Sequence, residues 1–314
     1  MARALSKSSL IQGEHHNNMK KILSRSWFFG ILLLPISLLS ISGLCVAENT
    51  ENVKFWNGNK TSARQGYEVA LLNACLSATE SKFGVANLII DNTNYPVAAD
   101  EGSVLDNGAQ ILVTIAGNVK FSDKNKIIIP QSLTKGLLGY RLLIVKDESL
   151  KVFDRISSTK DLRSLAVGIP ATWGDAEIFR RNSYSVVEKG TYEDLFTLLK
   201  NGDFDYTTLG VNEIEEAFEQ KAKPLGDLSI EPSVMVYYPF PLVFYVNSNN
   251  PALAKRIDMG LKMIKDSGEY EKLFDHYHGD VVARLGLNKR KIFSLDNPFL
   301  ADELAGFKPT LLNP

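Results

Sequence analysis

Cysteine is scarce in this sequence, and its scarcity excludes two kinds of stabilising site. The 314 residues include two cysteines. Cys45 lies in an apolar N-terminal stretch, which leaves Cys75 alone in the rest of the chain. One thiol cannot form an internal disulfide, and the spacing of a cysteine metal site is missing. We interpret Cys75 as a core thiol on the apolar face of a helix, with a reactive thiol as the alternative.

The sequence also lacks an excess of charge of either sign. Its net charge is −1, with 45% hydrophobic and 23% charged residues. Such a chain has no electrostatic field to hold nucleic acid or an anionic membrane, so we expect neither as a partner. The composition is that of a globular protein, and the length is sufficient for two cores of ordinary domain size.

Familiar motifs for catalysis are missing beyond the N-terminal stretch. That part of the sequence has no GxSxG, HExxH, phosphate-binding loop or GxGxxG. Two of the four histidines, His276 and His278, lie near the C-terminal end of the chain. Side chains two residues apart on a helix do not share a face, so this pair is a poor metal site. We therefore predict no enzymatic activity, no cofactor and no metal.

Residues 19–47 have the pattern of a secretory signal peptide. A positively charged start precedes an apolar run at 27–44, and small residues allow cleavage after Ala47. The positive charges are Lys20, Lys21 and Arg25. We predict export to the periplasm, with an uncleaved membrane anchor as the alternative. Residues 1–18 precede a second methionine, Met19, and are interpreted as an N-terminal extension or a mis-called start.

Two apolar runs about a hundred residues apart organise the rest of the chain. Residues 135–146 (KGLLGYRLLIVK) and 238–247 (YPFPLVFYVN) each predict a buried strand, because they are rich in Leu, Ile, Val, Phe and Tyr and bounded by turn residues. We interpret them as paired crossings between two lobes. Lobe I would comprise 48–141 and 244–314, and lobe II 142–243. A cleft above such a hinge suits closure on a small ligand.

Strand and helix patterns alternate in both predicted lobes. In lobe I, strands are expected at 53–56, 86–91 and 110–116, with helices at 63–82 and 98–105 between them. This order favours a parallel sheet flanked by helices. Lobe II continues the alternation, with strands expected at 165–169, 185–187 and 204–208 and helices at 172–181, 191–200 and 211–219.

A long helix is expected after the second crossing. Asn250 is a suitable N-cap, Pro251 suits the first helical position, and Gly268 suits the end. Apolar residues recur at helical spacing along one face, which we expect to be buried. They are Leu253, Ile257, Leu261 and Ile264.

Four segments, in this order, are similar to those of a known family. They are KGLLGYRLLIV (135–145), DLRSLAVGIPATWGDAEIF (161–179), GTYEDLFTLLKNGDFDYTTLGVNEI (190–214) and PLVFYVNSNNPALAKRIDMGLKMIKDSGEYEKLF (241–274). With these segments the chain resembles the type II periplasmic solute-binding proteins. It is most similar to solute-binding protein family 3, the polar-amino-acid-binding group of ABC transporters.

The resemblance implies an α/β protein with a two-lobe, periplasmic-binding-protein-like type II fold, in which each lobe is a β-sheet flanked by helices and two strands form the hinge. It implies capture of a small polar solute, amino-acid-like or an organic acid, for an inner-membrane ABC permease. We also expect a monomer. One alternative is a sensory binding protein that feeds a membrane receptor or kinase. The other is an enzyme on the same fold, a dehydratase or lytic glycosidase, using Asp175 or Glu213 as a lone carboxylate.

The turn formed by Thr172, Trp173, Gly174 and Asp175 is the first candidate binding site. It follows a predicted strand and begins a predicted helix. Ligands of open α/β sheets bind at such strand ends, and the unpaired N–H groups of a helix start suit a carboxylate or phosphate. The alternative is that Thr172 is an ordinary N-cap with Asp175 as its partner, while Trp173 packs.

Other candidates come from turns expected to face the same cleft. Trp56 and Tyr95, at strand-end turns of lobe I, would form an aromatic wall over the ligand or would pack in the core. The resemblance adds two turns to the cleft. Their residues are Thr114, Ala116 and Asn118 in lobe I, and Asn212 and Glu213 in lobe II.

The sequence departs from the family at two positions that hold an α-amino acid. Members usually carry an arginine after the first of these two turns, and the nearest cation here is Lys120, which lacks a planar bidentate fork. Members also often carry an aspartate five residues after the position of Asp205, where Gly210 stands here. Glu213 would replace that aspartate, or it is a solvated helix residue. These departures argue against an α-amino acid as the ligand.

Overall fold

The structure is a computed structural model that describes residues 50–312. The chain divides into two units, Met1–Val46 and Ala47–Pro314, and everything below concerns the second. The predicted extension at 1–18 and the predicted signal peptide at 19–47 lie outside the described residues. Among residues 50–312, no helix combines the length and the apolar character needed to cross a membrane.

The first sheet has five strands in the order β2-β1-β3-β10-β4. Strand β1 pairs in parallel with both β2 and β3, whereas β10 runs antiparallel to β3 and β4. The parallel sheet predicted for lobe I is therefore confirmed in its first three strands. The strands are β1 (Glu51–Trp56), β2 (Ala86–Asp91), β3 (Ile111–Ile115), β4 (Lys126–Ile128) and β10 (Leu242–Asn247).

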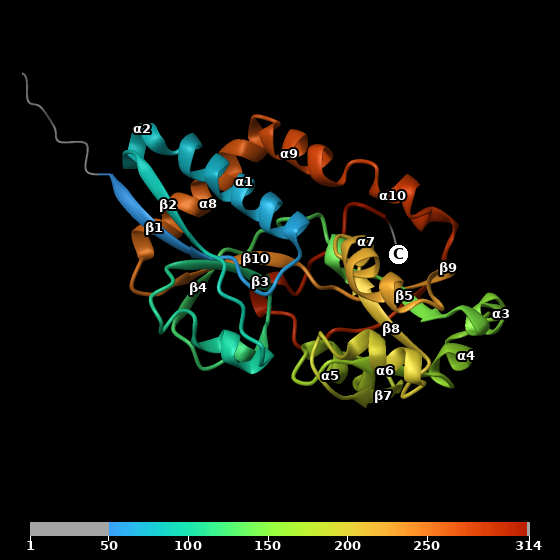
Figure 1. Ribbon diagram of the computed structural model, residues 1–314. Coiled ribbons are helices and arrows are strands. Elements are labelled where there is room, and N and C mark those ends of the chain that lie inside the picture. Colours follow the sequence, from blue (N-terminus) through green and yellow to red (C-terminus); the bar gives the residue numbers. More distant parts are fainter. Residues whose placement is uncertain (1–49, 313–314) are drawn as a thin grey trace, which may run out of the picture. The chain divides into compact units, whose positions relative to one another are not determined.

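Two long helices pack together in the first lobe. They are α1 (Ser62–Ala78) and α8 (Pro251–Asp266), and Figure 1 shows them with α2 (Glu80–Phe83). The helices approach closely at Gly260, where an added Cβ would lie 2.3 Å from the carbonyl oxygen of Cys75. Cys75 is fully buried on α1, and burial raises the pKa of its thiol to about 12. The prediction of a core thiol is confirmed.

The second sheet has six strands in the order β11-β9-β5-β8-β6-β7. Strand β5 is central, antiparallel to both neighbours, and β6 pairs in parallel with β7 and β8. The strands are β5 (Tyr140–Lys146), β6 (Ala166–Ile169), β7 (Ser185–Glu188), β8 (Tyr206–Gly210), β9 (Leu228–Tyr237) and β11 (Lys291–Ser294).

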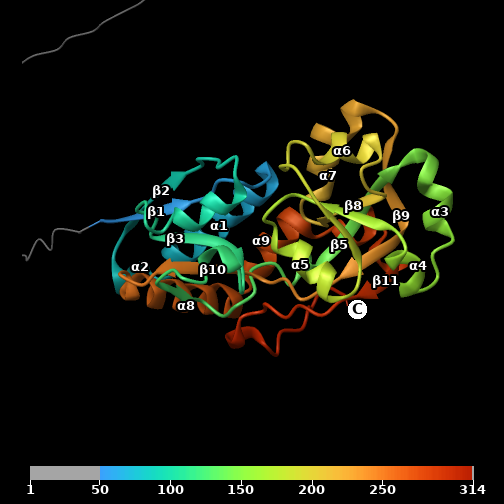
Figure 2. The same ribbon diagram turned by 90° about the horizontal axis from the view of Figure 1, so that it is seen from below.

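Short helices accompany the second sheet. Figures 1 and 2 show α3 and α4 together at the end of this lobe that is remote from the first sheet. Helix α9 (Glu269–His278) follows α8 and leads toward α10 (Val281–Arg284) and β11. The other helices are α3 (Leu150–Asp154), α4 (Thr159–Arg163), α5 (Gly174–Arg181), α6 (Leu195–Asn201) and α7 (Ile214–Ala217).

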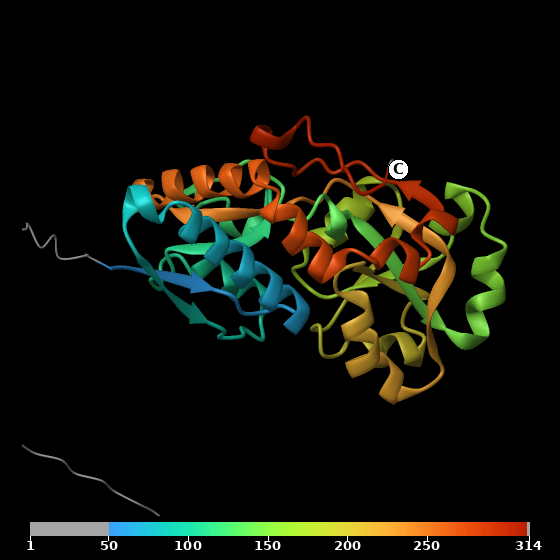
Figure 3. The same ribbon diagram turned by 90° about the horizontal axis from the view of Figure 1, so that it is seen from above.

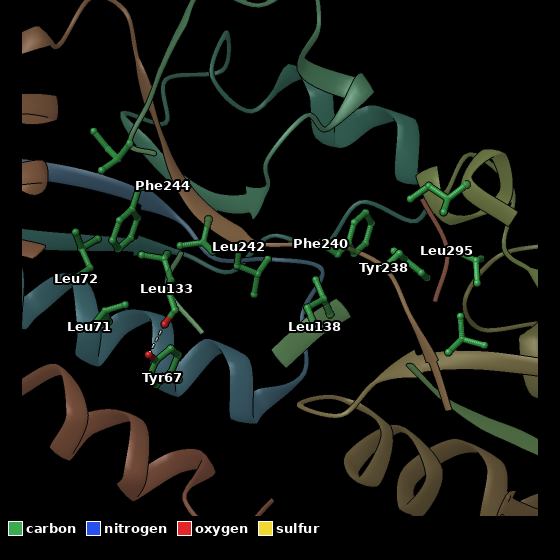
Figure 4. Packing of buried hydrophobic residues seen from close by; sticks show 14 of the residues in the cluster. Tyr67, Leu71, Leu72, Leu133, Leu138, Tyr238, Phe240, Leu242, Phe244 and Leu295 are labelled. Carbon is green, nitrogen blue, oxygen red and sulfur yellow. Dashed lines mark hydrogen bonds between the residues drawn. The ribbon is translucent and has the colours of Figure 1, made fainter. Parts of the chain in front are cut away.

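The two predicted crossings lie side by side. Tyr140 pairs with Tyr237, and the Gly139 carbonyl accepts a hydrogen bond from the Tyr238 amide at 3.2 Å. Near the first sheet, the Leu133 amide donates to the Leu242 carbonyl at 2.9 Å. Figure 4 shows apolar side chains of both crossings packed in one cluster. The pairing is confirmed, although the strands expected at 135–146 and 238–247 are shorter and belong to different sheets.

Residues 244–314, expected in lobe I, are shared between the lobes. Helix α8 packs in the first lobe, but β11 extends the second sheet by pairing with β9. We call residues 295–312 the C-terminal segment. Figure 3 shows it running from β11 back toward the first lobe and returning. Leu304 packs in the apolar cluster of the first sheet, and Leu312 bonds through its backbone to the Tyr140 hydroxyl.

Burial of His278 predicts a pH-dependent stability. Its imidazole lies 4.8 Å from the ring centroid of Tyr67 and 5.4 Å from that of Phe274. Burial, with a smaller effect of the Arg284 charge, lowers the pKa of His278 from 6.5 to about 4. Between pH 6.5 and 4 the unfolded chain therefore binds a proton that the folded protein does not. The free energy of unfolding is expected to fall by ~3 kcal/mol over this window.

Urea unfolding at pH 7 and at pH 4.5 tests this prediction. In H278F a ring of similar shape is kept but cannot titrate, so the share of the loss due to His278 should disappear. H276F removes an exposed imidazole from the same helix and should keep the whole loss. Equal losses in wild type and H278F would assign the titration to other groups.

Candidate functional site

A cavity of about 150 Å³ lies between the two lobes. Lobe I contributes the turn after β1, the start of α1 and the end of β3, while lobe II contributes β5, the start of α5 and the turn after β8. Leu138, Phe240 and Leu242 of the crossings also line it. The charged residues of the lining are Lys60, Arg64, Glu101, Lys120, Arg141, Asp175 and Glu213. The cavity is therefore small and strongly polar.

Lys60 lies buried in the turn that joins β1 to α1. Its Nζ is 2.5 Å from Glu68 Oε2 and donates to Asn57 Oδ1 at 3.1 Å. Burial lowers the pKa of Lys60 to about 8, against the attraction of Glu68. The ammonium also lies 5.2 Å from the ring centroid of Phe55 and 5.7 Å from that of Trp56. This turn therefore places at the edge of the cavity an ammonium group that loses its proton more readily than an exposed lysine does.

Arg64 joins the two lobes from the first turn of α1. Its Nη1 is 2.7 Å from Glu213 Oε1, and Nη2 is 2.8 Å from Glu68 Oε1. Glu68 stands one turn along the same helix, whereas Glu213 comes from lobe II. Burial opposes the charge of Arg64, but the two carboxylates outweigh it and raise its pKa. The Arg64 guanidinium therefore forms one ion pair with a carboxylate of each lobe.

A second contact between the lobes caps α1. The carboxylate of Glu216, on α7, accepts from the amides of Ser62 and Ala63 at 2.9 and 3.0 Å. Both amides belong to the first turn of the helix and have no partner inside it. They lie at the positive end of the helix dipole, which favours an anion there. Although burial raises it, the net pKa of Glu216 is lowered, because the two amides stabilise the carboxylate.

Lys120, the third cation that lobe I contributes to the lining, forms an ion pair within the same lobe. Lys120 Nζ is 2.9 Å from Glu101 Oε2, and Asn59 Nδ2 donates to Glu101 Oε1 at 2.7 Å.

Trp56 is nearly buried, and its indole donates to the Thr93 carbonyl at 3.0 Å. Its ring centroid is 6.0 Å from that of Tyr95. Trp56 therefore both packs and lines the cavity.

A buried ion pair lies at the floor of the cavity in lobe II. Arg141 Nη2 is 2.8 Å from Asp175 Oδ1, and the Tyr238 hydroxyl donates to the same oxygen at 2.5 Å. Arg141 is 2% exposed and Asp175 6%. Burial raises the pKa of Tyr238 well above its usual value, so the phenol stays protonated and donates. The pair fixes the start of α5 to strand β5.

The turn before α5 has an unusual backbone at Thr172. Its φ is 68°, in the left-handed region that β-branched residues rarely adopt. Its amide donates to Glu188 Oε1 at 2.9 Å. Helix α5 begins at Gly174 with Trp173 as N-cap, so the alternative in which Thr172 caps the helix is wrong. Trp173 lines the cavity and stacks on Tyr192, with centroids 5.9 Å apart.

Solved structures with a similar fold include periplasmic binding proteins. An arginine transport system periplasmic binding protein from Legionella pneumophila is 16% identical, covers 73% of this chain and 100% of its own, and has a TM-score of 0.52. A Salmonella typhimurium periplasmic binding protein with high arginine specificity is 16% identical over 72% of this chain and 99% of its own, with a TM-score of 0.51. The chain has the fold of the type II periplasmic binding proteins.

A sensor domain shares this periplasmic-binding-protein fold. A histidine kinase sensor domain with similarity to periplasmic binding proteins is 15% identical, covers 74% of this chain and 97% of its own, and has a TM-score of 0.51. The sequence matches no protein-family description and no curated protein. The likeness is therefore one of fold, and the ligand has to be argued from the side chains in the cleft.

Most of the predicted site residues gather in the cleft of the type II fold. Those lining the cavity described above are Trp56, Thr114, Asn118, Trp173, Gly174, Asp175 and Glu213. Ala116 lines a neighbouring cavity. Tyr95 and Thr172 lie outside both linings. Asn212 also lies outside them, and within residues 50–312 neither polar atom of its buried amide has a hydrogen-bond partner.

Several charged residues of the cleft were not predicted. Lys60 lies in the turn after β1, where the strand-end argument singled out Trp56 alone, and Arg64 lies in the first turn of α1. Applied to the whole turn, that argument would have found Lys60. Arg141 is the one charge inside an otherwise apolar strand pattern, which was a second signal. The pairing of Arg64 with Glu213 depends on the contact between lobes and has no local signal.

Proposed function

We propose that the protein is a periplasmic solute-binding protein that holds a small polar solute between its lobes for an inner-membrane ABC permease. The observation that carries the proposal is the charged cavity to which both lobes of a type II fold contribute. A solute that touches both lobes favours their closed arrangement, because its affinity is higher there. The signal peptide predicted at 19–47 supports a periplasmic location.

Arg64 is the proposed anchor for an anionic group of the solute. It lies in the cavity lining, and Glu213 of the opposite lobe contacts its guanidinium. A solute carboxylate would compete with Glu213 for the planar fork of N–H donors, which suits bidentate binding. Arg64 would thus replace the arginine that the sequence lacks after β3. We propose an organic acid or an amino-acid-like solute on this basis.

Binding is better supported than catalysis. Asp175 is paired with Arg141, and Glu213 with Arg64, so each carboxylate is held by a guanidinium at less than 3 Å. A general base must lie within hydrogen-bond reach of the proton that it removes, and here each carboxylate is instead engaged by a guanidinium. A sensory role is the second candidate, and the shared fold of the histidine kinase sensor domain supports it. A neighbouring permease gene or signalling gene separates the two roles.

Native mass spectrometry of protein purified from its own periplasm tests the proposal directly. We expect a small molecule to be released from the complex on activation. A melting screen with amino acids, organic acids and polyamines extends the test. A solute at 100 times its Kd adds about 2.7 kcal/mol of stability, which raises the midpoint by roughly 5–10 °C for a chain of this size.

The variant R64M assigns the anchor. It should lose most of the stabilisation by an anionic solute, whereas K262M, which removes an exposed cation on α8, should keep it. If an anionic solute stabilised both variants equally, Arg64 would not be a residue that binds it. A screen in which no solute shifts the midpoint, with no molecule co-purified, would contradict the function itself.

A further inference from the structure

A second cavity adjoins the charged cleft. Its volume is about 160 Å³, and the two cavities share Ile115, Asn118, Gly174 and Phe240 in their linings. The second cavity is different in chemistry, because most of the side chains that enclose it are apolar. They include Ile115, Ala116, Val119, Ile178, Phe240 and Phe299. We call it the apolar compartment. A solute in the charged cleft therefore has an apolar space beside it.

The C-terminal segment builds one wall of the apolar compartment. Phe299 lies against Gly117, whose φ is 84° and whose added Cβ would stand 1.6 Å from the Phe299 carbonyl oxygen. Asn297 Nδ2 donates to the Pro239 carbonyl at 2.8 Å, in the second crossing. The Arg181 guanidinium lies 5.6 Å from the Phe299 ring centroid. The wall is thus held by both lobes and by the hinge.

The compared binding proteins do not account for the whole chain. They are matched over 97–100% of their own length, yet they cover 72–74% of this one. The uncovered share, at least 26% of 314 residues, is about 82 residues, which exceeds the 49 that precede the described part. This chain therefore carries additions beyond its N-terminal stretch. Whichever residues these additions are, the C-terminal segment supplies Asn297 and Phe299 to the lining of the apolar compartment.

The size of the apolar compartment limits what it accepts. A cavity of about 150 Å³ lined by Leu, Ile and Phe takes up benzene. We propose, resting on the solute-binding function above, that the solute is amphiphilic. Its polar group lies in the charged cleft, and an apolar group about the size of a benzene ring lies between β3, α5 and the C-terminal segment. The class is an aromatic or branched aliphatic acid or amino acid.

Three pairs of probes test this proposal, each with one polar group and with or without a ring. They are 3-phenylpropionate with propionate, L-phenylalanine with L-alanine, and 2-phenylethylamine with ethylamine. Calorimetric titration gives the affinity of each. For the pair whose polar group suits the cleft, the ring should strengthen binding roughly 10–100-fold, because an apolar side chain of this size leaves water.

The variant V119W tests whether the ring's gain in affinity comes from the apolar compartment. Val119 lines the compartment and is half-exposed, so an indole at this position fills the space with little effect on folding. V152W places the same change at a half-exposed valine on α3, which lines neither cavity. We expect V119W to abolish the ring's advantage and V152W to keep it. Should V119W melt well below wild type, V119F makes the same test with a smaller ring.

The outcomes separate this proposal from the function on which it rests. If strictly polar solutes bind but no ring-bearing probe gains affinity over its partner, the apolar compartment is not a subsite and the solute-binding function stands. The same holds if V119W keeps the full advantage of the ring. If neither these probes nor the wider screen shows any binding, both proposals fail together.

Discussion

Replacing Arg141 with methionine is expected to lower the free energy of unfolding by about 3–5 kcal/mol. The change leaves the Asp175 carboxylate buried without its cation, while the Tyr238 hydroxyl alone cannot compensate the charge. Breaking a buried ion pair costs more than forming it gains, because the remaining charge stays out of water. Denaturant unfolding of R141M against wild type measures the loss.

Two further variants show whether burial of the charge is the cause. R141M/D175N removes both charges and keeps a group that accepts from Tyr238, so it should recover most of the stability. R284M breaks the half-exposed pair of Arg284 with Glu215 and should cost less than 1 kcal/mol. A loss of under 1 kcal/mol in R141M, or a double variant no better than the single one, would contradict the account.

Replacing Leu261 with alanine is expected to cost about 2–5 kcal/mol. Leu261 is fully buried on α8, in the cluster that this helix shares with α1. Gly260 beside it already brings the backbones of the two helices close together, so the helices have little freedom to close a cavity. The lost apolar contacts and the remaining cavity both reduce stability.

M263A is the matched control on the same helix. Met263 is 42% exposed, so its truncation should change the free energy of unfolding by no more than about 0.5 kcal/mol. Thermal or urea unfolding of the two variants gives the comparison. Similar small losses in L261A and M263A would mean that the buried face of α8 is not the one described.

Local patterns predicted α8 almost residue by residue. The helix begins at Pro251, its predicted apolar face is buried, and Gly268 follows its end with a φ of 78°. Helical periodicity, a proline at the first position and a left-handed glycine act within a few residues, so the sequence alone contains this information. Strand β2 was also predicted at its observed bounds for the same reason.

Elements that depend on distant partners could not be predicted. Strand β4 has three residues, and β11 has four and joins the second sheet only through β9. The helix expected at 211–219 begins instead at Ile214 and continues as a π-helix over Phe218–Ala222. Short edge strands and irregular helix turns carry weak periodic signals, so tertiary pairing decides them.

The residues of the candidate site were likewise predicted where local patterns locate them and missed where contacts between distant segments do. The strand-end argument located the turn at Trp173, and the resemblance added the turn at Asn118; both residues line the cavity. Arg64, which reaches the cavity from α1, was missed, because it meets Glu213 only when the two lobes come together. The left-handed backbone at Thr172 was also unpredicted, since the surrounding turn imposes it on a residue that does not favour it.

The path of the C-terminal segment has a mechanical consequence. The segment adds a third connection between the lobes beside the two crossings, because Phe299 packs against Gly117 of lobe I and lies beside Arg181 of lobe II, while Leu312 bonds to Tyr140. Moving the lobes apart would therefore disturb these contacts as well as bend the two crossings.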